Sequence, residues 1–272
     1  MSKHELKVLP VMKDPSRPKY RETHPNLLKP PFRMAIIGSS KSGKSNYVVN
    51  LLRPCYYGGG KKKDGKKIDS CFDRIYIFSP NLGMDETTRC FRKLCKEQDI
   101  KQDYKDSYIQ NIINYQKAHE GSEDKVLIIA DDLIALGAHP QAKIFTSASY
   151  LRHLNCSIIY ISQTYKGHYS LPPVVRNNLC GCVMFRCPSA QQIKSFCDDM
   201  CGTFGSKENV QNLLAYATRE PYHFAFFNYR DENVWKNNTD LLWEKYDENG
   251  QFSSEFNEKE LWSSDSEDDD DS

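Results

Sequence analysis

The chain carries the pattern Gly-x-x-x-x-Gly-Lys-Ser, which begins at Gly38 and ends at Ser45. Its two glycines permit backbone conformations that a side chain would block, so successive N–H groups can turn inward and hold anionic oxygens. Lys44 would reach the β- and γ-phosphates of a nucleotide, and the Ser45 hydroxyl would bind Mg²⁺. We therefore expect a phosphate-binding loop made of Gly38, Ser39, Ser40, Lys41, Ser42, Gly43, Lys44 and Ser45.

The residues on either side of this loop predict the elements that hold it. Residues 34–37 are apolar and partly β-branched, which favours a strand, and residues 46–53 are helix-like up to Pro54. The positive N-terminal end of such a helix would face the same anionic group. A glycine-rich turn with a solvated lysine is the alternative, and the strand and helix around the loop argue against it.

A pair of acids, Asp131 and Asp132, follows the apolar run 126–130. The carboxyl end of a strand is where acids can meet a bound nucleotide, so Asp131 would hold Mg²⁺ through water and Asp132 would polarise an attacking water. Acid pairs also cap strands for purely structural reasons. Together with the phosphate loop, however, the pair indicates a site for a nucleotide and Mg²⁺.

A second buried strand, residues 157–162, is followed by Gln163. An uncharged amide in this position can hydrogen-bond both the γ-phosphate and the attacking water, and so can report whether the phosphate is present. A glutamine that only satisfies a nearby backbone group is the alternative.

Strands and helix-length amphipathic stretches alternate along the chain, which predicts one α/β domain with a largely parallel sheet and helices on both faces. The runs 126–130 and 158–161 are almost continuously apolar, as is typical of central strands covered on both sides. The expected strands are 34–37, 74–79, 126–130, 157–162, 182–186 and 223–229.

The remaining segments divide the chain. Residues 1–30 predict an extended arm that packs on the domain or on a neighbour, residues 31–230 the domain that carries the phosphate loop, and residues 263–272 a disordered acidic tail. The glycine- and lysine-rich stretch 56–67 is either a contact for a phosphate backbone or a solvated loop. Between domain and tail, residues 231–262 predict a helical extension, since a docked helix would explain their apolar positions, namely Trp235, Leu241, Leu242, Trp243 and Tyr246.

Composition sets further limits. The 272 residues hold 37 Lys and Arg against 36 Asp and Glu, so only the body without its acidic tail is clearly basic and suited to a polyanionic partner. The 10 cysteines, several of them in apolar runs, read as reduced thiols that pack as small hydrophobes. Residues 1–19 do not resemble a secretory signal, and no apolar run approaches the about 18 residues that cross a bilayer.

We call residues 157–162, which precede Gln163, the sensor strand. Leu151-Arg152-His153 comes before this strand and residues 171–178 come after it. This order of motifs resembles that of the poxvirus A32-type genome-packaging ATPases of the FtsK–HerA superfamily. Such ATPases occur in large DNA viruses, virophages and related elements. The resemblance covers residues 32–229. It implies an α/β P-loop NTPase fold of the ASCE, RecA-like type, with strand order 5-1-4-3-2 and the sensor strand between the phosphate-loop strand and the acidic strand.

The same resemblance implies what the protein does. Subunits of the family form rings, pentamers or hexamers, which use ATP and Mg²⁺ to drive double-stranded DNA into a preformed capsid. It further implies a capsid or membrane protein at a packaging vertex as partner, ATP as the only small-molecule substrate, and a place in the host cytoplasm, a viral factory or the virion. Many relatives carry Glu where this chain has Asp132, whose shorter side chain changes its reach to the water.

Ring ATPases also need a positive charge from the neighbouring subunit, an arginine finger worth roughly 10³ to 10⁵ in rate in related NTPases. Arg152 and Arg176 are the candidates, with Arg186 a weaker third. Each could instead pair with a surface carboxylate, which is the usual role of an arginine. The segment with Lys166, Gly167 and His168 either lines a central pore near DNA or forms an ordinary turn.

Two other functions share the phosphate loop. A small-molecule or nucleoside kinase would need an acceptor pocket and an arginine-bearing lid, which the sequence does not reveal. A non-hydrolysing protein that binds nucleotide only to assemble would leave Asp132 and Gln163 with structural roles.

Overall fold

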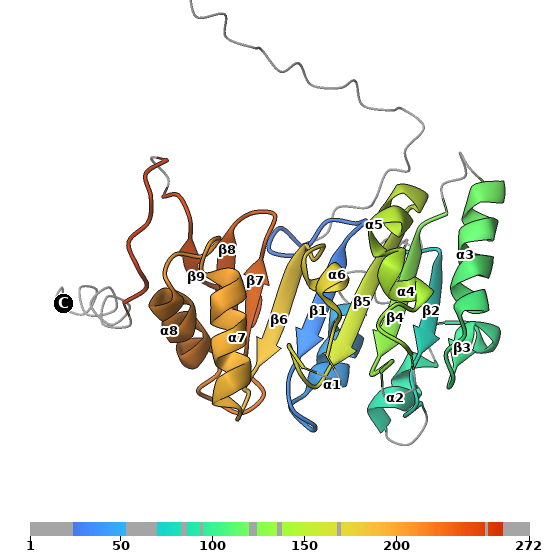
Figure 1. Cartoon of the computed structure of the whole chain (residues 1–272), viewed down its shortest axis with the longest axis horizontal. Helices are drawn as coiled ribbons and strands as arrows, with labels where there is room; N and C mark the ends of the chain where they lie inside the picture. Colours follow the sequence, from blue (N-terminus) through green and yellow to red (C-terminus); the bar gives the residue numbers. More distant parts are fainter. Residues whose placement is uncertain are drawn as a thin grey trace, which may run out of the picture.

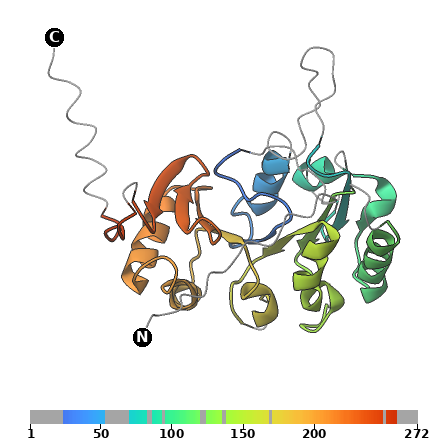
Figure 2. The ribbon, with the colours of Figure 1, turned by 90° about the horizontal axis from the view of Figure 1, so that it is seen from above.

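The computed structural model describes residues 24–52, 70–82, 86–92, 95–119, 124–134, 138–167, 170–247 and 250–257. In this described part of the chain, one nine-stranded sheet runs through the molecule between two layers of helices (Figures 1 and 2). The strands are β1 (Arg33–Ile37), β2 (Arg74–Phe78), β3 (Ile100–Lys101), β4 (Val126–Asp131), β5 (Cys156–Ser162), β6 (Gly181–Phe185), β7 (Phe224–Asn228), β8 (Asn233–Lys236) and β9 (Asp240–Glu244).

The spatial order of the strands is β3-β2-β4-β5-β1-β6-β7-β8-β9. Pairing is parallel from β3 to β6 and antiparallel from β6 to β9. The carboxyl ends of the parallel strands therefore meet at one edge of the sheet, where ligands bind in open α/β folds. The side chains of β1, β4, β5 and β6 are buried throughout, as their apolar sequences require.

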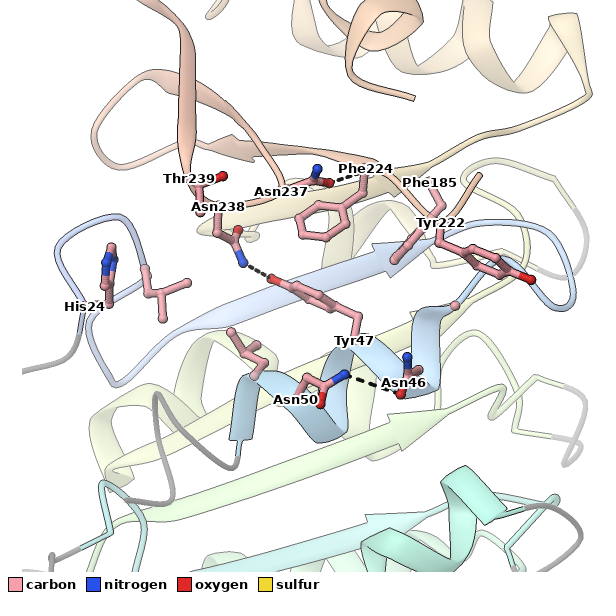
Figure 3. Close-up of a pocket in the computed structure, with 13 residues that line it drawn as sticks. His24, Asn46, Tyr47, Asn50, Phe185, Tyr222, Phe224, Asn237, Asn238 and Thr239 are labelled. Carbon is pink, nitrogen blue, oxygen red and sulfur yellow. Dashed lines mark hydrogen bonds between the residues drawn. The ribbon is translucent and has the colours of Figure 1, made fainter. Parts of the chain in front are cut away.

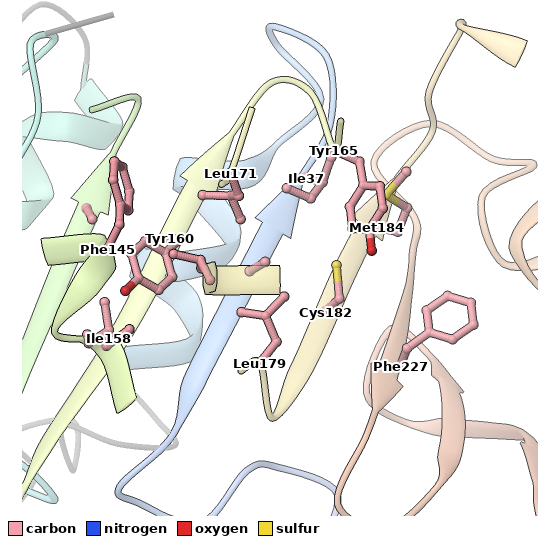
Figure 4. Close-up of a cluster of buried hydrophobic side chains, with 14 of the residues drawn as sticks. Ile37, Phe145, Ile158, Tyr160, Tyr165, Leu171, Leu179, Cys182, Met184 and Phe227 are labelled. Carbon is pink, nitrogen blue, oxygen red and sulfur yellow. The ribbon is translucent and has the colours of Figure 1, made fainter. Parts of the chain in front are cut away.

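Helices bury one apolar core against each face of the sheet. One core lies beneath α1 (Lys44–Leu51) and α2 (Glu86–Phe91). The other joins the remaining helices to side chains such as Tyr160, Cys182 and Phe227 (Figure 4). The helices on that face are α3 (Asp106–Ala118), α4 (Lys143–Thr146), α5 (Ala148–Leu151), α6 (Pro173–Arg176), α7 (Ala190–Met200) and α8 (Lys207–Ala217), and short 3-10 helices cover Glu97–Asp99 and Arg152–Leu154.

The predicted strand order 5-1-4-3-2 does not describe this sheet. It omits β3 at one edge and the antiparallel strands β7, β8 and β9 at the other. β3 is only two residues long, too short for a periodic sequence signal, and β8 and β9 lie in the segment interpreted as helical. The sensor strand β5 does lie between β1 and β4.

The predicted helix in the C-terminal extension is wrong, because residues 233–244 form the β8–β9 hairpin. Asn237 and Asn238 have φ angles of 54° and 63°, a conformation that asparagine tolerates better than most residues, and they turn the chain between the strands. The apolar positions serve the sheet instead: Trp243 is buried and packs on Phe204.

The start of the described chain packs on the same domain. Leu27 and Leu28 are buried in the core beneath α1, and Arg230 donates to the backbone carbonyls of Lys29 and Pro31, both at 2.6 Å. The rest of the predicted arm, the stretch 56–67 and the acidic tail lie outside the described residues. Within the described chain, no helix combines the length and the apolar character that a membrane span needs.

Candidate functional site

The predicted phosphate loop connects the carboxyl end of β1 to α1. The Gly38 N–H donates to the Ser162 carbonyl at 3.3 Å, which ties the start of the loop to the end of β5. Gly38 has no room for a side chain: a Cβ there would lie 2.6 Å from Ser42 Oγ and 2.7 Å from Phe185 Cβ. Gly43, which precedes α1, has a φ of 103° that side chains rarely adopt. Gly38 is thus required by the packing around it and Gly43 by its backbone conformation.

Lys44 folds back over its own loop. Its Nζ donates to the carbonyl oxygens of Gly38 at 2.7 Å and Ser39 at 2.8 Å. Burial lowers the pKa of Lys44, and the nearby carboxylates of Asp131 and Asp132 partly oppose that shift. An ammonium group that is partly removed from water interacts strongly with an anionic oxygen placed beside it.

Asp131 ends β4 as a buried carboxylate, 7% exposed. Its Oδ2 accepts a hydrogen bond of 2.7 Å from the hydroxyl of Ser79, which directly follows the neighbouring strand β2 and is completely buried. We did not predict Ser79 from the sequence. The available signal was its place, since a polar residue directly after β2 must lie at the same edge as Asp131 when the two strands are parallel.

Asp132 and Gln163 lie against each other just beyond the ends of β4 and β5. The Gln163 amide donates from Nε2 to Asp132 Oδ2 at 3.0 Å. The backbone of Asp132 has a φ of 50°, and its N–H donates to the Ile161 carbonyl at 3.0 Å. This turn carries the Asp132 carboxylate away from the β4 axis and toward the end of the sensor strand.

A cleft of about 520 Å³ brings these groups together. Its lining includes the predicted residues Ser40, Lys41, Ser42, Gly43, Lys44, Ser45, Asp131, Asp132 and Gln163.

The residues fit a nucleotide phosphate and Mg²⁺. The hydroxyl oxygen of Ser42 is buried without a hydrogen-bond partner among the described residues, and a phosphate oxygen could accept its proton. A hydroxyl from Ser45 and a carboxylate from Asp131 are the oxygen donors that Mg²⁺ takes alongside phosphate oxygens. Such a site needs few protein ligands, and the described residues contain no cluster of three or more His, Cys, Asp or Glu that could hold a metal.

The candidate arginines do not line this cleft. Arg152 is exposed on the 3-10 helix before β5, at the opposite edge of the sheet from the phosphate loop, where its Nε donates to His153. Arg176 is engaged within the chain: Nη1 donates to the Leu171 carbonyl at 2.8 Å, and Nε lies 3.6 Å from Asp199 Oδ2. Arg186 is exposed directly after β6, at the same edge as the phosphate loop.

The predicted pore segment is only partly described. Lys166 lies 3.9 Å from Asp199 Oδ1, Gly167 has a φ of 132° with open space around it, and His168 lies outside the described residues.

No protein-family model and no curated protein matches this chain. Solved structures of similar fold include the genome packaging NTPase B204 from Sulfolobus turreted icosahedral virus 2 in complex with AMP, with a TM-score of 0.51 and 16% identity over 77% of this chain and 98% of that chain. Its complex with AMPPCP gives a TM-score of 0.50 and 15% identity over 76% and 97%. B204, the DNA-packaging ATPase from Sulfolobus turreted icosahedral virus, gives 0.50 and 17% over 77% and 98%. The chain therefore shares the fold of B204, an α/β fold with a mostly parallel sheet, as the sequence resemblance implied. The narrower A32-type assignment stays a prediction.

Proposed function

We propose that this protein is an ATP-driven motor that moves double-stranded DNA into a preformed viral capsid, with ATP hydrolysed between the subunits of a ring. The observation that carries the proposal is the single cleft in which the loop 38–45 meets Asp131, Asp132 and Gln163 at the ends of neighbouring strands. The fold shared with B204, a genome packaging NTPase solved with AMP and AMPPCP, supports the same conclusion.

Each residue then has a distinct task. Backbone N–H groups of the loop and the Lys44 ammonium bind the phosphates, while Ser45 and Asp131 hold the Mg²⁺. Bound Mg²⁺ neutralises charge that develops on the transferring phosphate. Asp132 accepts the proton of the attacking water at Oδ2, and the Gln163 amide, 3.0 Å from that oxygen, orients the same water.

The positive charge from a neighbouring subunit remains to be assigned. Arg152 could reach the nucleotide of a neighbouring subunit, because it is exposed and lies at the edge of the sheet opposite the cleft of its own chain. Arg176 fits less well, because a carbonyl and a carboxylate of its own chain already hold it. Arg186 is exposed beside the phosphate loop and becomes a stronger candidate than its sequence context suggested.

The deciding experiment measures ATP turnover against protein concentration, with and without duplex DNA, at several salt concentrations. We expect a cooperative onset with concentration, because the site is shared, and a DNA stimulation that weakens as salt rises. Lys44→Ala should abolish turnover, whereas Lys117→Ala, an exposed lysine on α3, should leave it unchanged. ATP turnover that is the same with and without duplex DNA at every salt concentration would rule out the motor.

The same assay separates the alternatives. A kinase would transfer phosphate to an added nucleoside rather than to water. A protein that binds nucleotide only to assemble would form oligomers with ATP and release no phosphate, and its Asp132→Asn variant would assemble as the wild type does.

A further inference from the structure

A second cavity, of about 430 Å³, adjoins the phosphate cleft on the other side of the start of α1. Gly43 and Asn46 line both spaces. Figure 3 shows the second cavity between α1 and the β8–β9 turn, with Tyr222 at one end and His24 at the other. Its volume lies in the range of small-molecule sites, which is about 300 to 1,000 Å³.

The walls of this cavity are aromatic and held in place. The ring centroids of Tyr47 and Phe224 are 4.6 Å apart, and those of Phe224 and Phe185 are 5.2 Å apart. Asn238, from the β8–β9 turn, donates from Nδ2 to the Tyr47 hydroxyl at 3.1 Å, and Asn26 donates to the Asn238 carbonyl at 3.0 Å. The hairpin and the start of the described chain thus fix one wall onto α1.

The chemistry of the lining differs from that of the phosphate cleft. Among the described residues that line the second cavity there is no Lys, Arg, Asp or Glu, whereas the phosphate cleft contains two lysines and two aspartates. The polar groups of the second cavity are mainly amides, among them Asn46, Asn50 and Asn237, which can both donate and accept hydrogen bonds. Such a space suits a neutral aromatic ring with polar edges and not a further phosphate.

Packing within the fold does not explain the exposure and the backbone conformation of Tyr222. It is 71% exposed and has a φ of 66°, which is uncommon for a bulky residue and costs free energy. Its ring reaches the phosphate loop, since a Cβ on Gly43 would lie 3.4 Å from Tyr222 Cδ1. An exposed aromatic ring held in a strained conformation beside a binding loop points to a ligand that covers it.

We propose that this cavity receives the adenosine moiety of the nucleotide and that the base stacks on Tyr222. The proposal rests on the function proposed above, because it extends the same site. A phosphate chain in the loop has its terminal phosphate near Asp131, Asp132 and Gln163, so its other end leaves past Gly43 and Asn46, where the aromatic cavity begins. The C-terminal hairpin then contributes to nucleotide binding as well as to the sheet.

The test compares ATP with inorganic tripolyphosphate, which carries the phosphates without the base, in calorimetric titrations with Mg²⁺ present. Aromatic stacking of a base is lost on substitution by alanine at a cost that corresponds to about 5- to 150-fold in Kd. Tyr222→Ala should therefore weaken ATP by at least about fivefold and leave the Kd of tripolyphosphate unchanged. Tyr222→Phe, which keeps the ring, should bind both ligands as the wild type does.

The variants isolate the ring. Alanine has the same difficulty as tyrosine with a positive φ, so the comparison does not simply report relief of strain. Tyr246→Ala removes an exposed tyrosine, 47% exposed, that does not line the cavity, and it should change neither Kd. Thermal melting of each variant checks that the fold is intact.

Two results would overturn the proposal. One is a Tyr222→Ala variant in which the Kd values of ATP and of tripolyphosphate rise by the same factor, or in which neither Kd changes. The other is a wild type that binds tripolyphosphate as tightly as ATP, which would show that the adenosine makes no contact. Both are binding results and do not depend on turnover. A wild type with the expected difference in binding but no hydrolysis would refute the motor and leave the base site standing.

Discussion

Replacing Ser79 by alanine should reveal how firmly the fold holds the predicted metal ligand Asp131. The Ser79 hydroxyl is completely buried and donates at 2.7 Å to Asp131 Oδ2, and the aspartate is 7% exposed. Alanine removes this donor, and water has little access to replace it. In the folded variant the carboxylate would lack this hydrogen bond. In the unfolded chain water hydrates the carboxylate in both proteins, so only the folded state is destabilised.

The expected size follows from the charge of the acceptor. A hydrogen bond to an ionised group contributes about 1.5 to 3 kcal/mol to folding, against about 0.5 to 1.5 kcal/mol for a neutral pair. Ser79→Ala should therefore lower the free energy of unfolding by about 1.5 to 3 kcal/mol. Because the serine also orients Asp131, the predicted metal ligand, the variant should bind Mg²⁺ about 10- to 100-fold more weakly in the ATPase assay.

Urea unfolding of the wild type and the variant measures the first effect, with an unchanged slope as the check on two-state behaviour. Ser170→Ala is the matched control, since that hydroxyl is also buried and donates at 2.7 Å, but to the neutral carbonyl of Gly167. In an Asp131→Ala background, Ser79→Ala should cost little, because the partner is gone. The reasoning fails if Ser79→Ala costs no more than Ser170→Ala, or if its cost is the same in both backgrounds.

Three further outcomes follow from contacts elsewhere. Gly38→Ala should destabilise the fold by about 1 to 3 kcal/mol in urea, because the new methyl would meet side-chain atoms at 2.6 and 2.7 Å; an unchanged stability would contradict the tight packing. Burial raises the pKa of the Cys156 and Cys182 thiols to about 12, so at pH 8 both should stay protonated and unlabelled by a thiol reagent until urea unfolds the chain; mass spectrometry of the labelled protein checks this. Arg176→Ala should cost about 1.5 to 3 kcal/mol of stability and the exposed Arg152→Ala less than about 0.5, and similar costs would show that the contacts of Arg176 are weak.

The phosphate loop and the strands behind it could be predicted because their signals are local. The loop is a run of eight consecutive residues, Gly38 to Ser45, and the strands β4 and β5 are apolar runs that end in Asp131 and Ser162. Each signal needs only its own residues to be recognised. Parallel pairing then forces the strand ends to one edge, so the meeting of Asp132 and Gln163 follows from the strand pattern alone.

Contacts between distant residues could not be predicted in this way. Ser79 lies 52 residues before Asp131, and nothing in its own neighbourhood distinguishes it from other serines. The sequence kept Arg176 as a candidate close behind Arg152, because the carboxylate of Asp199 that holds Arg176 comes from α7, a distant part of the chain. The paired state of an arginine is a property of the packed structure.

The prediction for the C-terminal hairpin was wrong for a different reason. Its apolar residues are compatible with a helix, and the two adjacent asparagines, Asn237 and Asn238, were the turn signal that should have decided the matter. Both have positive φ, which a helix interior would not tolerate. Apolar spacing in a short segment cannot by itself separate a helix from a pair of strands.

The failed prediction of the hairpin concerns one half of the candidate site. The groups that would hold phosphate and metal lie at strand ends next to recognisable apolar runs, so the sequence displays them. The groups around the second cavity, such as Tyr47, Phe185, Tyr222 and Asn238, come from four separate elements or turns and share no motif. The turn of the β8–β9 hairpin forms one wall of that cavity. Because the sequence analysis assigned this segment to a helix, it could not predict the cavity. A prediction of base recognition therefore had to wait for the tertiary structure, whereas a prediction of phosphate chemistry did not.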